Sequence, residues 1–175
     1  VAAYGVIANC SLVAAAIFNG IAQGSQPIAS KLYGEGSHKE IIKVIKMAAV
    51  TALSVSVLLV AAAFLFTKPI AGIFNSEHDP VLAAYAENGI RLYFLGFIFA
   101  GINITGAGIL SAVEAANGAF AVSVSRGFIA IVICALAMSA IWGLNGVWLS
   151  FAAAELITFV ITVCEIKKNA NKLLN

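Results

Sequence analysis

Long apolar runs without a single charge dominate this sequence. From Val1 to Ser30 there is no Asp, Glu, Lys, Arg or His, and two further uncharged cores cover 47–67 and 92–113. Runs of this kind are near the roughly 20 residues that a helix needs to cross a bilayer, and they are far too long for strands. Hydrophobic residues make up 62% of the chain and charged residues 10%, so a soluble domain could not bury this apolar surface. We therefore predict an all-α integral membrane protein.

Turn signals divide the chain into five predicted transmembrane helices. The S-x-x-E spacing at 37–40 is that of a capping box and opens the second helix. The Asp-Pro pair at 79–80 reads as an N-cap followed by proline at the first helical position of the third helix. Asn-Gly at 117–118 and GLNG at 143–146 separate the last three helices. The predicted helices cover 2–32, 40–67, 80–113, 119–142 and 147–166.

The basic residues predict the orientation. Eight lie at one end of the predicted helices and two at the other, and such residues concentrate on the cytoplasmic side. The first loop, the loop over 114–126 and the C-terminus are therefore predicted to be cytoplasmic, in a multi-pass plasma-membrane protein. Five spans then place Val1 outside, which predicts that the chain is a piece of a longer polypeptide whose earlier spans are missing. The eight are Lys31, Lys39, Lys43, Lys46, Arg126, Lys167, Lys168 and Lys172, and the two are Lys68 and Arg91.

A stripe of uncharged polar side chains runs along the first helix. Its members are spaced i, i+4, i+7 and i+11, which places them on one helical face. On a span of membrane length, such a stripe is typical of the wall of a transport pathway, although amides there can also form hydrogen bonds between helices. The stripe consists of Asn19, Gln23, Gln26 and Ser30.

Three residues beside the stripe predict the shape and packing of the same helix. Pro27 has no N–H, so the helix should bend there, and we interpret this proline as a conformational feature rather than a contact. Gly20 and Gly24 form a G-x-x-x-G pair, which lets another backbone approach closely.

Glu155 is the most informative single residue. It lies near the middle of the last span, where an ionisable group costs a few kcal/mol and should face the bundle interior, water or a partner. It either belongs to a cation or proton site or makes a structural hydrogen bond to a neighbouring helix. Asn103, in the middle of the third helix, has the same two interpretations, namely a cavity-lining amide or an interhelical hydrogen bond.

Other polar and reactive residues receive plainer interpretations. Arg126 and Glu114 flank a predicted cytoplasmic turn, where interfacial charges or a mutual ion pair are expected. The three cysteines lie singly in apolar runs, as small buried residues do. The sequence contains no nucleophile–base set, phosphate loop or metal-ligand spacing, and a net charge of +2 is small for a nucleic-acid binder. We therefore expect no enzyme, no metal centre and no nucleic-acid partner.

Four motifs in order give the chain a family resemblance. The run IFNGIAQGSQPIASKLYGEG resembles the eighth helix of multidrug and toxic compound extrusion (MATE) transporters. IAGIFNSEHDPVLAAYAENGIRLYFLGF resembles the outer loop that leads into the tenth helix, and GILSAVEAANGAFAVSVSRG resembles the next hairpin with its arginine. GLNGVWLSFAAAE resembles the start of the twelfth helix. The likeness extends over nearly all 175 residues.

The resemblance implies a fragment of a twelve-helix, two-lobe transporter, with residues 1–175 forming part of the C-terminal lobe. It implies ion-coupled antiport of small organic, often cationic, compounds, with Na⁺ or H⁺ as the coupling ion and no other cofactor. The partners would be the lipid bilayer, these substrates and the missing N-terminal half of the same polypeptide. The chain lacks the acid that some family members carry within the third of these helices, so the resemblance does not choose the coupling ion.

Two other functions remain open at this stage. A flippase for lipid-linked oligosaccharides, from the same broad superfamily, should carry basic residues within its spans to meet phosphate. The uncharged cores contain none, and Arg126 lies at the edge of one. A small membrane subunit that does not transport is the alternative from a different class.

Overall fold

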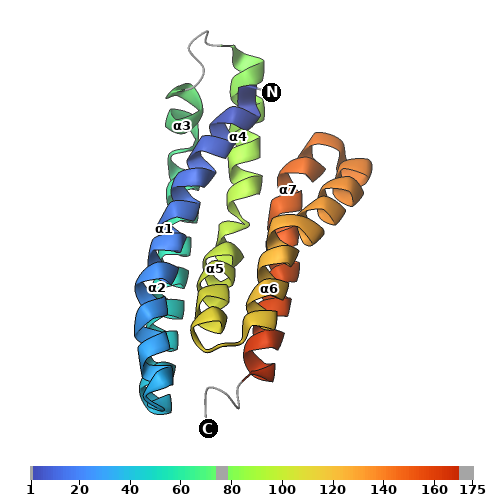
Figure 1. The fold of residues 1–175 in the computed structure, drawn as a ribbon. Helices are drawn as coiled ribbons and strands as arrows, with labels where there is room; N and C mark the ends of the chain where they lie inside the picture. Colours follow the sequence, from blue (N-terminus) through green and yellow to red (C-terminus); the bar gives the residue numbers. More distant parts are fainter. Residues whose placement is uncertain (1, 74–78, 170–175) are drawn as a thin grey trace.

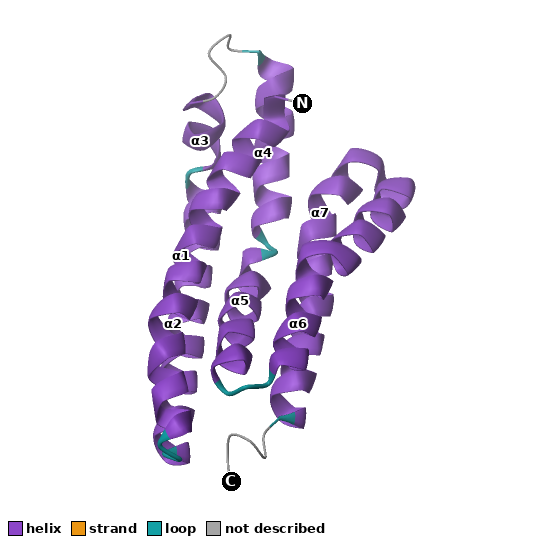
Figure 2. Ribbon diagram, viewed as in Figure 1, coloured by secondary structure: helices purple, strands orange, loops and turns teal. Residues whose placement is uncertain are grey.

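The computed structural model describes residues 2–73 and 79–169, and all regular structure in these residues is helical (Figures 1 and 2). This confirms the predicted fold class. The elements in chain order are α1 (Ala2–Gly34), α2 (His38–Leu65), α3 (Thr67–Ile73), α4 (Pro80–Phe94), α5 (Phe97–Ala112), α6 (Ala116–Val124), the π-helical turn η1 (Ser125–Ile129) and α7 (Ala130–Lys168).

The central helix is α5, which packs against α1, α2, α6 and α7. Its composition explains this position, because small residues allow neighbouring helices to approach closely. A Cβ built on Gly101 would lie 2.5 Å from the ring of Phe18, and one built on Gly106 would lie 2.6 Å from the methyl group of Thr162. The long helices α1 and α2 run side by side on one flank of α5, and α6 and α7 lie on the other (Figure 1).

The predicted helix over 80–113 is two helices in the structure. α4 and α5 follow one another with a bend of 44° at Leu95–Gly96. The aromatic ring of Phe151 occupies the place where a side chain at Gly96 would begin, so the chain can pass close to α7 at this point only as glycine. Sequence analysis missed the break because Gly96 lies in a long apolar run, with no proline, charged residue or capping residue beside it.

The last two predicted helices form a hairpin. Helical structure runs from Ala116 to Lys168 with one residue, Gly143, outside the helical region at φ 56° and ψ −130°. Only glycine adopts this backbone readily, and the chain reverses there. The two arms then run antiparallel, so that Ser125 of one arm reaches Thr158 of the other.

The described residues contain three helical stretches that are long and apolar enough to cross a membrane, and the bent pair α4–α5 makes a fourth. One of the three, 116–168, folds back at Gly143. Each of its arms is roughly 40 Å long at 1.5 Å per residue, which exceeds the roughly 30 Å of the hydrocarbon core. The described part of the chain can therefore cross the bilayer five times. Large apolar side chains such as Leu12, Met47 and Leu136 are exposed on its outside, as a lipid-facing surface requires.

The helix ends agree with the sequence in one case and differ in another. Asp79 caps α4 as predicted, since its side chain accepts a hydrogen bond from the backbone N–H of Val81 at 2.8 Å and Pro80 follows. Ser37 precedes α2 but makes no side-chain capping hydrogen bond, so the predicted capping box does not form. Instead Gly36, at φ 67°, turns the chain between α1 and α2.

Candidate functional site

An ion pair lies between the two arms of the hairpin. Arg126 comes from η1 and Glu155 from α7, and Arg126 Nε lies 2.7 Å from Glu155 Oε1. The N–H direction falls outside hydrogen-bond geometry, so the contact is ionic. The Glu155 side chain is 2% exposed and that of Arg126 29%, so the arginine covers the carboxylate. Burying either charge alone costs several kcal/mol, which the pairing offsets.

Asn103 of α5 ties the carboxylate to the centre of the bundle. Its Nδ2 donates to Glu155 Oε2 at 2.7 Å and to the backbone oxygen of Glu155 at 2.9 Å. The hydroxyl of Thr162 donates to Asn103 Oδ1 at 3.0 Å. The same hydroxyl lies within hydrogen-bond distance, 2.9 Å, of the Thr158 carbonyl oxygen. The amide is thereby oriented with its NH₂ group toward the carboxylate. The interhelical hydrogen bond that the sequence allowed for both Glu155 and Asn103 is present.

Arg126 lies farther along the hairpin arm than its interpretation as an interfacial residue suggests. Arg126 lies ten residues after the start of α6 at Ala116, which places it about 15 Å along the hairpin arm, half the thickness of the hydrocarbon core. η1 is a π-helical turn, and such turns inside α-helices occur frequently at functional sites. The structure gives Arg126 an ionic partner on the facing arm, Glu155.

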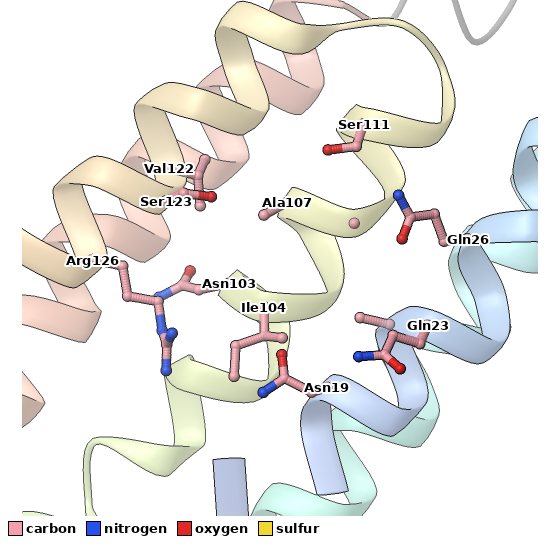
Figure 3. A pocket seen from close by; sticks show the side chains of 12 residues that line it. Asn19, Gln23, Gln26, Asn103, Ile104, Ala107, Ser111, Val122, Ser123 and Arg126 are labelled. Carbon is pink, nitrogen blue, oxygen red and sulfur yellow. The ribbon is translucent and has the colours of Figure 1, made fainter. Parts of the chain in front are cut away.

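A polar cavity of about 340 Å³ opens between α1, α5 and α6 (Figure 3). We call it the amide cavity. α5 forms its floor, α1 one wall, and α6 with η1 the other. Three of the stripe residues project from the first wall and Arg126 extends from the second. The polar side chains that line it are Asn19, Gln23, Gln26, Asn103, Ser111, Ser123 and Arg126.

A second cavity, of about 400 Å³, also includes Arg126 in its lining, and four of its other lining residues are aromatic. We call it the aromatic cavity. Tyr93 and Phe151 stack at 4.2 Å between ring centroids with their planes 6° apart, and Tyr4 stacks on Trp148 at 6.2 Å. The indole N–H of Trp148 is buried and has no hydrogen-bond partner among the described residues. Glu155 lines this cavity.

The two cavities share Arg126. The guanidinium and its carboxylate partner therefore form a partition between an amide-lined space and an aromatic one. The charge on this partition depends on a single ion pair.

The structure brings most of the predicted site residues together. Asn19, Gln23, Gln26 and Asn103 line one cavity, and Glu155 lines the adjoining one. Gly20 and Gly24 have no described atom within 4 Å of a built Cβ, so the close approach predicted for this pair does not occur within the described chain. α1 is helical through Pro27, and the predicted bend stays a prediction.

Sequence analysis missed Arg126 as a site residue. Tyr93, Trp148 and Phe151 were not among the predicted site residues either. Counting residues from the helix start at Ala116, rather than from the end of the uncharged run, would have placed Arg126 at mid-depth. The aromatic residues carry no comparable signal, because Tyr93 and Phe151 meet only through the packing of α4 on α7.

The fold and the site define a multi-pass α-helical membrane protein with a charged partition between two cavities. The sequence matches the MatE family model over residues 1–136, and the chain belongs to this family. No curated protein matches the sequence.

Two solved structures have the same fold, and both are described as a multidrug resistance MATE family transporter of the MOP superfamily. The inward-facing structure matches with a TM-score of 0.89 and 14% identity over 97% of this chain. The outward-facing structure matches with the same TM-score and identity over 98%. This chain covers 40% and 39% of those two proteins, so it corresponds in length to less than half of such a transporter.

Proposed function

We propose that the chain is part of a secondary active transporter that exports small organic cations across the plasma membrane in exchange for Na⁺ or H⁺. Membership of the MatE family supports transport, and the aromatic cavity supports the substrate class. Aromatic faces attract organic cations through their quadrupoles, most strongly where water is excluded. Stacked rings and a carboxylate lie together in this cavity. That combination is the observation that carries the proposal.

Glu155 is the residue on which substrate and coupling ion would compete. In the structure its charge is balanced by Arg126 and its other oxygen accepts from Asn103. A cation that enters the aromatic cavity can replace Arg126 as the counter-charge, and Na⁺ or a proton can do the same. Because the site accommodates one extra positive charge at a time, binding of one species favours release of the other.

The conformational part of the proposal is alternating access. The missing N-terminal half would face the amide cavity, and the two halves would rock around the space between them. Pro27, beside the stripe on α1, would permit the bending this motion needs. The end of α7 lies at the same end of the molecule as the turn between α1 and α2 (Figure 1), and this end would be cytoplasmic.

Efflux of ethidium by cells that express the protein at its full encoded length tests the proposal. Glu155→Gln keeps the size and hydrogen bonding of the side chain and removes its charge. It should abolish ion-driven ethidium efflux while the protein still accumulates in the membrane. The matched control is Glu165→Gln on the same helix, where the carboxylate is 19% exposed and pairs at 3.6 Å with the exposed Lys168.

Efflux by the Glu165→Gln variant should equal that of the unsubstituted protein. Unchanged efflux by Glu155→Gln, with unchanged dependence on external pH and Na⁺, would show that Glu155 only packs. An absence of ethidium efflux from the unsubstituted protein under both a pH and a Na⁺ gradient would contradict the proposed function itself.

A flippase for lipid-linked oligosaccharides is a second candidate, favoured by the position of Arg126. The sequence argued against it because the uncharged cores hold no basic residue. Arg126 supports it, because this residue lines the amide cavity about 15 Å along the hairpin arm. Translocation of a fluorescent lipid-linked sugar in proteoliposomes, without ethidium transport, would favour this function over the first.

A further inference from the structure

We propose that the amide cavity binds an anionic group of the transported compound, a carboxylate in the simplest case, with Arg126 as its cationic contact. The inference rests on the proposed transport function and extends it. Substrates would then include compounds that carry a carboxylate besides their cationic part.

The lining of the amide cavity carries a positive charge at Arg126. Arg126 is the one charged side chain among the described residues that line the amide cavity, and the other polar ones are amides and hydroxyls. No carboxylate is among the described residues that line this cavity, because Glu155 lines the aromatic cavity instead. Because Glu155 offsets the charge of Arg126, the attraction of an anion depends on the guanidinium N–H groups that the contact at Nε does not use.

The amides on the facing wall supply uncommitted donors. Asn19 and Gln23 are exposed and Gln26 is half-buried. None of the three side chains makes a hydrogen bond to a described residue. Asn103 differs, because its NH₂ group is held by Glu155 and its oxygen by Thr162. We therefore assign Asn103 to support of the ion pair, and the amides of α1 to the ligand.

Arg126 can contact a second anion without leaving the first. A guanidinium has five N–H donors in a planar fork, and the contact with Glu155 is made at Nε. The side chain is 29% exposed, so part of it is open to the cavities. A carboxylate from the amide cavity can pair with this open side, and such charge-assisted pairs are the strong ones.

One consequence links the two cavities. With a second carboxylate beside Arg126, two negative groups share one positive charge. A cation in the aromatic cavity, near Glu155, restores neutrality. The cationic and anionic ends of one compound would thus favour each other's binding across the partition.

Two dyes that differ by one ester test the proposal. Rhodamine 110 carries a free carboxylate, and rhodamine 123 is its methyl ester, with the same cationic xanthene. Binding to the purified protein at its full encoded length, in detergent, is measured by fluorescence polarisation. Arg126→Gln alone is unsuitable because it leaves Glu155 buried without a counter-charge. The informative comparison is Glu155→Gln against the double variant Arg126→Gln/Glu155→Gln, which differ only at the arginine.

Relative to Glu155→Gln, the double variant should bind rhodamine 110 about 10- to 100-fold more weakly, the range of a hydrogen bond to a charged group. The affinity for rhodamine 123 should change by less than about threefold. Gln23→Leu, which leaves the ion pair intact, should weaken binding of rhodamine 110 and leave rhodamine 123 unchanged.

Equal affinity of the single and double variants for rhodamine 110 would overturn the inference. So would binding of rhodamine 123 but not rhodamine 110 by the unsubstituted protein. Both results leave the proposed efflux of ethidium intact, so the two failures are distinguishable. Binding of neither dye by the unsubstituted protein would also overturn the inference, whereas ethidium efflux tests the proposed function separately.

Discussion

At the scale of single residues, the site depends on a chain of polar contacts from Thr162 through Asn103 to Glu155. Each link joins a different pair of side chains, and the whole chain lies in the interior. Thr162 is two helical turns from Glu155 and cannot bond it directly. It acts by orienting the amide of Asn103, so that a single NH₂ group faces the carboxylate.

Thr162→Val therefore should reduce both stability and transport. The change keeps the shape of the side chain and removes the donor to Asn103 Oδ1, and an unsatisfied buried acceptor costs about 1–3 kcal/mol. We expect a lower melting temperature in detergent and slower ethidium efflux. Ser150→Ala is the control on the same helix, because Ser150 donates only to the backbone of Val147 among the described residues. Equal melting temperatures for the two variants would contradict this role of Thr162.

The sequence identified several members of this site but not its geometry. Glu155 and Asn103 stand out because each is polar within an apolar run, and the i, i+4, i+7 spacing places Asn19, Gln23 and Gln26 on one face. Arg126 was misplaced because an uncharged run was taken to mark the whole span. The pairing of these residues depends on how α5 packs against the hairpin, which no local pattern records.

At the scale of elements, the positions of glycines determine which helices can pack closely. α5 fits between α1, α2 and α7 because its glycines meet side chains of the neighbouring helices directly. By contrast, the pair Gly20 and Gly24, which the sequence favoured as a packing motif, faces open space in the described chain. The G-x-x-x-G spacing is common, and whether it forms a close helix contact depends on a second helix that packs against it.

Gly101→Ala should destabilise the protein. A methyl group at this position would lie 2.5 Å from Phe18 and 2.7 Å from Ser56 Oγ, so α1 or α2 must move away. Overpacking of this kind costs about 1–3 kcal/mol. The matched control is Gly5→Ala on α1, where nothing lies within 4 Å and alanine favours the helix. A circular-dichroism melt that shows equal midpoints for both variants would contradict the packing of α5.

At the scale of the whole molecule, the amide-lined face is the unusual surface. Most of the exposed side chains in the middle of α2 are apolar, as lipid requires, whereas Asn19 and Gln23 are exposed amides near the middle of α1. The chain covers about 40% of the two solved transporters with its fold. Both facts agree with the proposal that further protein covers this face.

The 175-residue chain expressed alone therefore should not transport. Each polar group left unsatisfied in hydrocarbon costs several kcal/mol, so the stripe on α1 would drive an isolated chain to self-associate or be degraded. Ethidium efflux from cells that express only this chain should equal that of cells with empty vector. Co-expression of a separate polypeptide that supplies the other half should restore efflux, because it covers the amide cavity and completes the pathway. A clear gain in efflux from the chain alone would show that the amide face needs no cover.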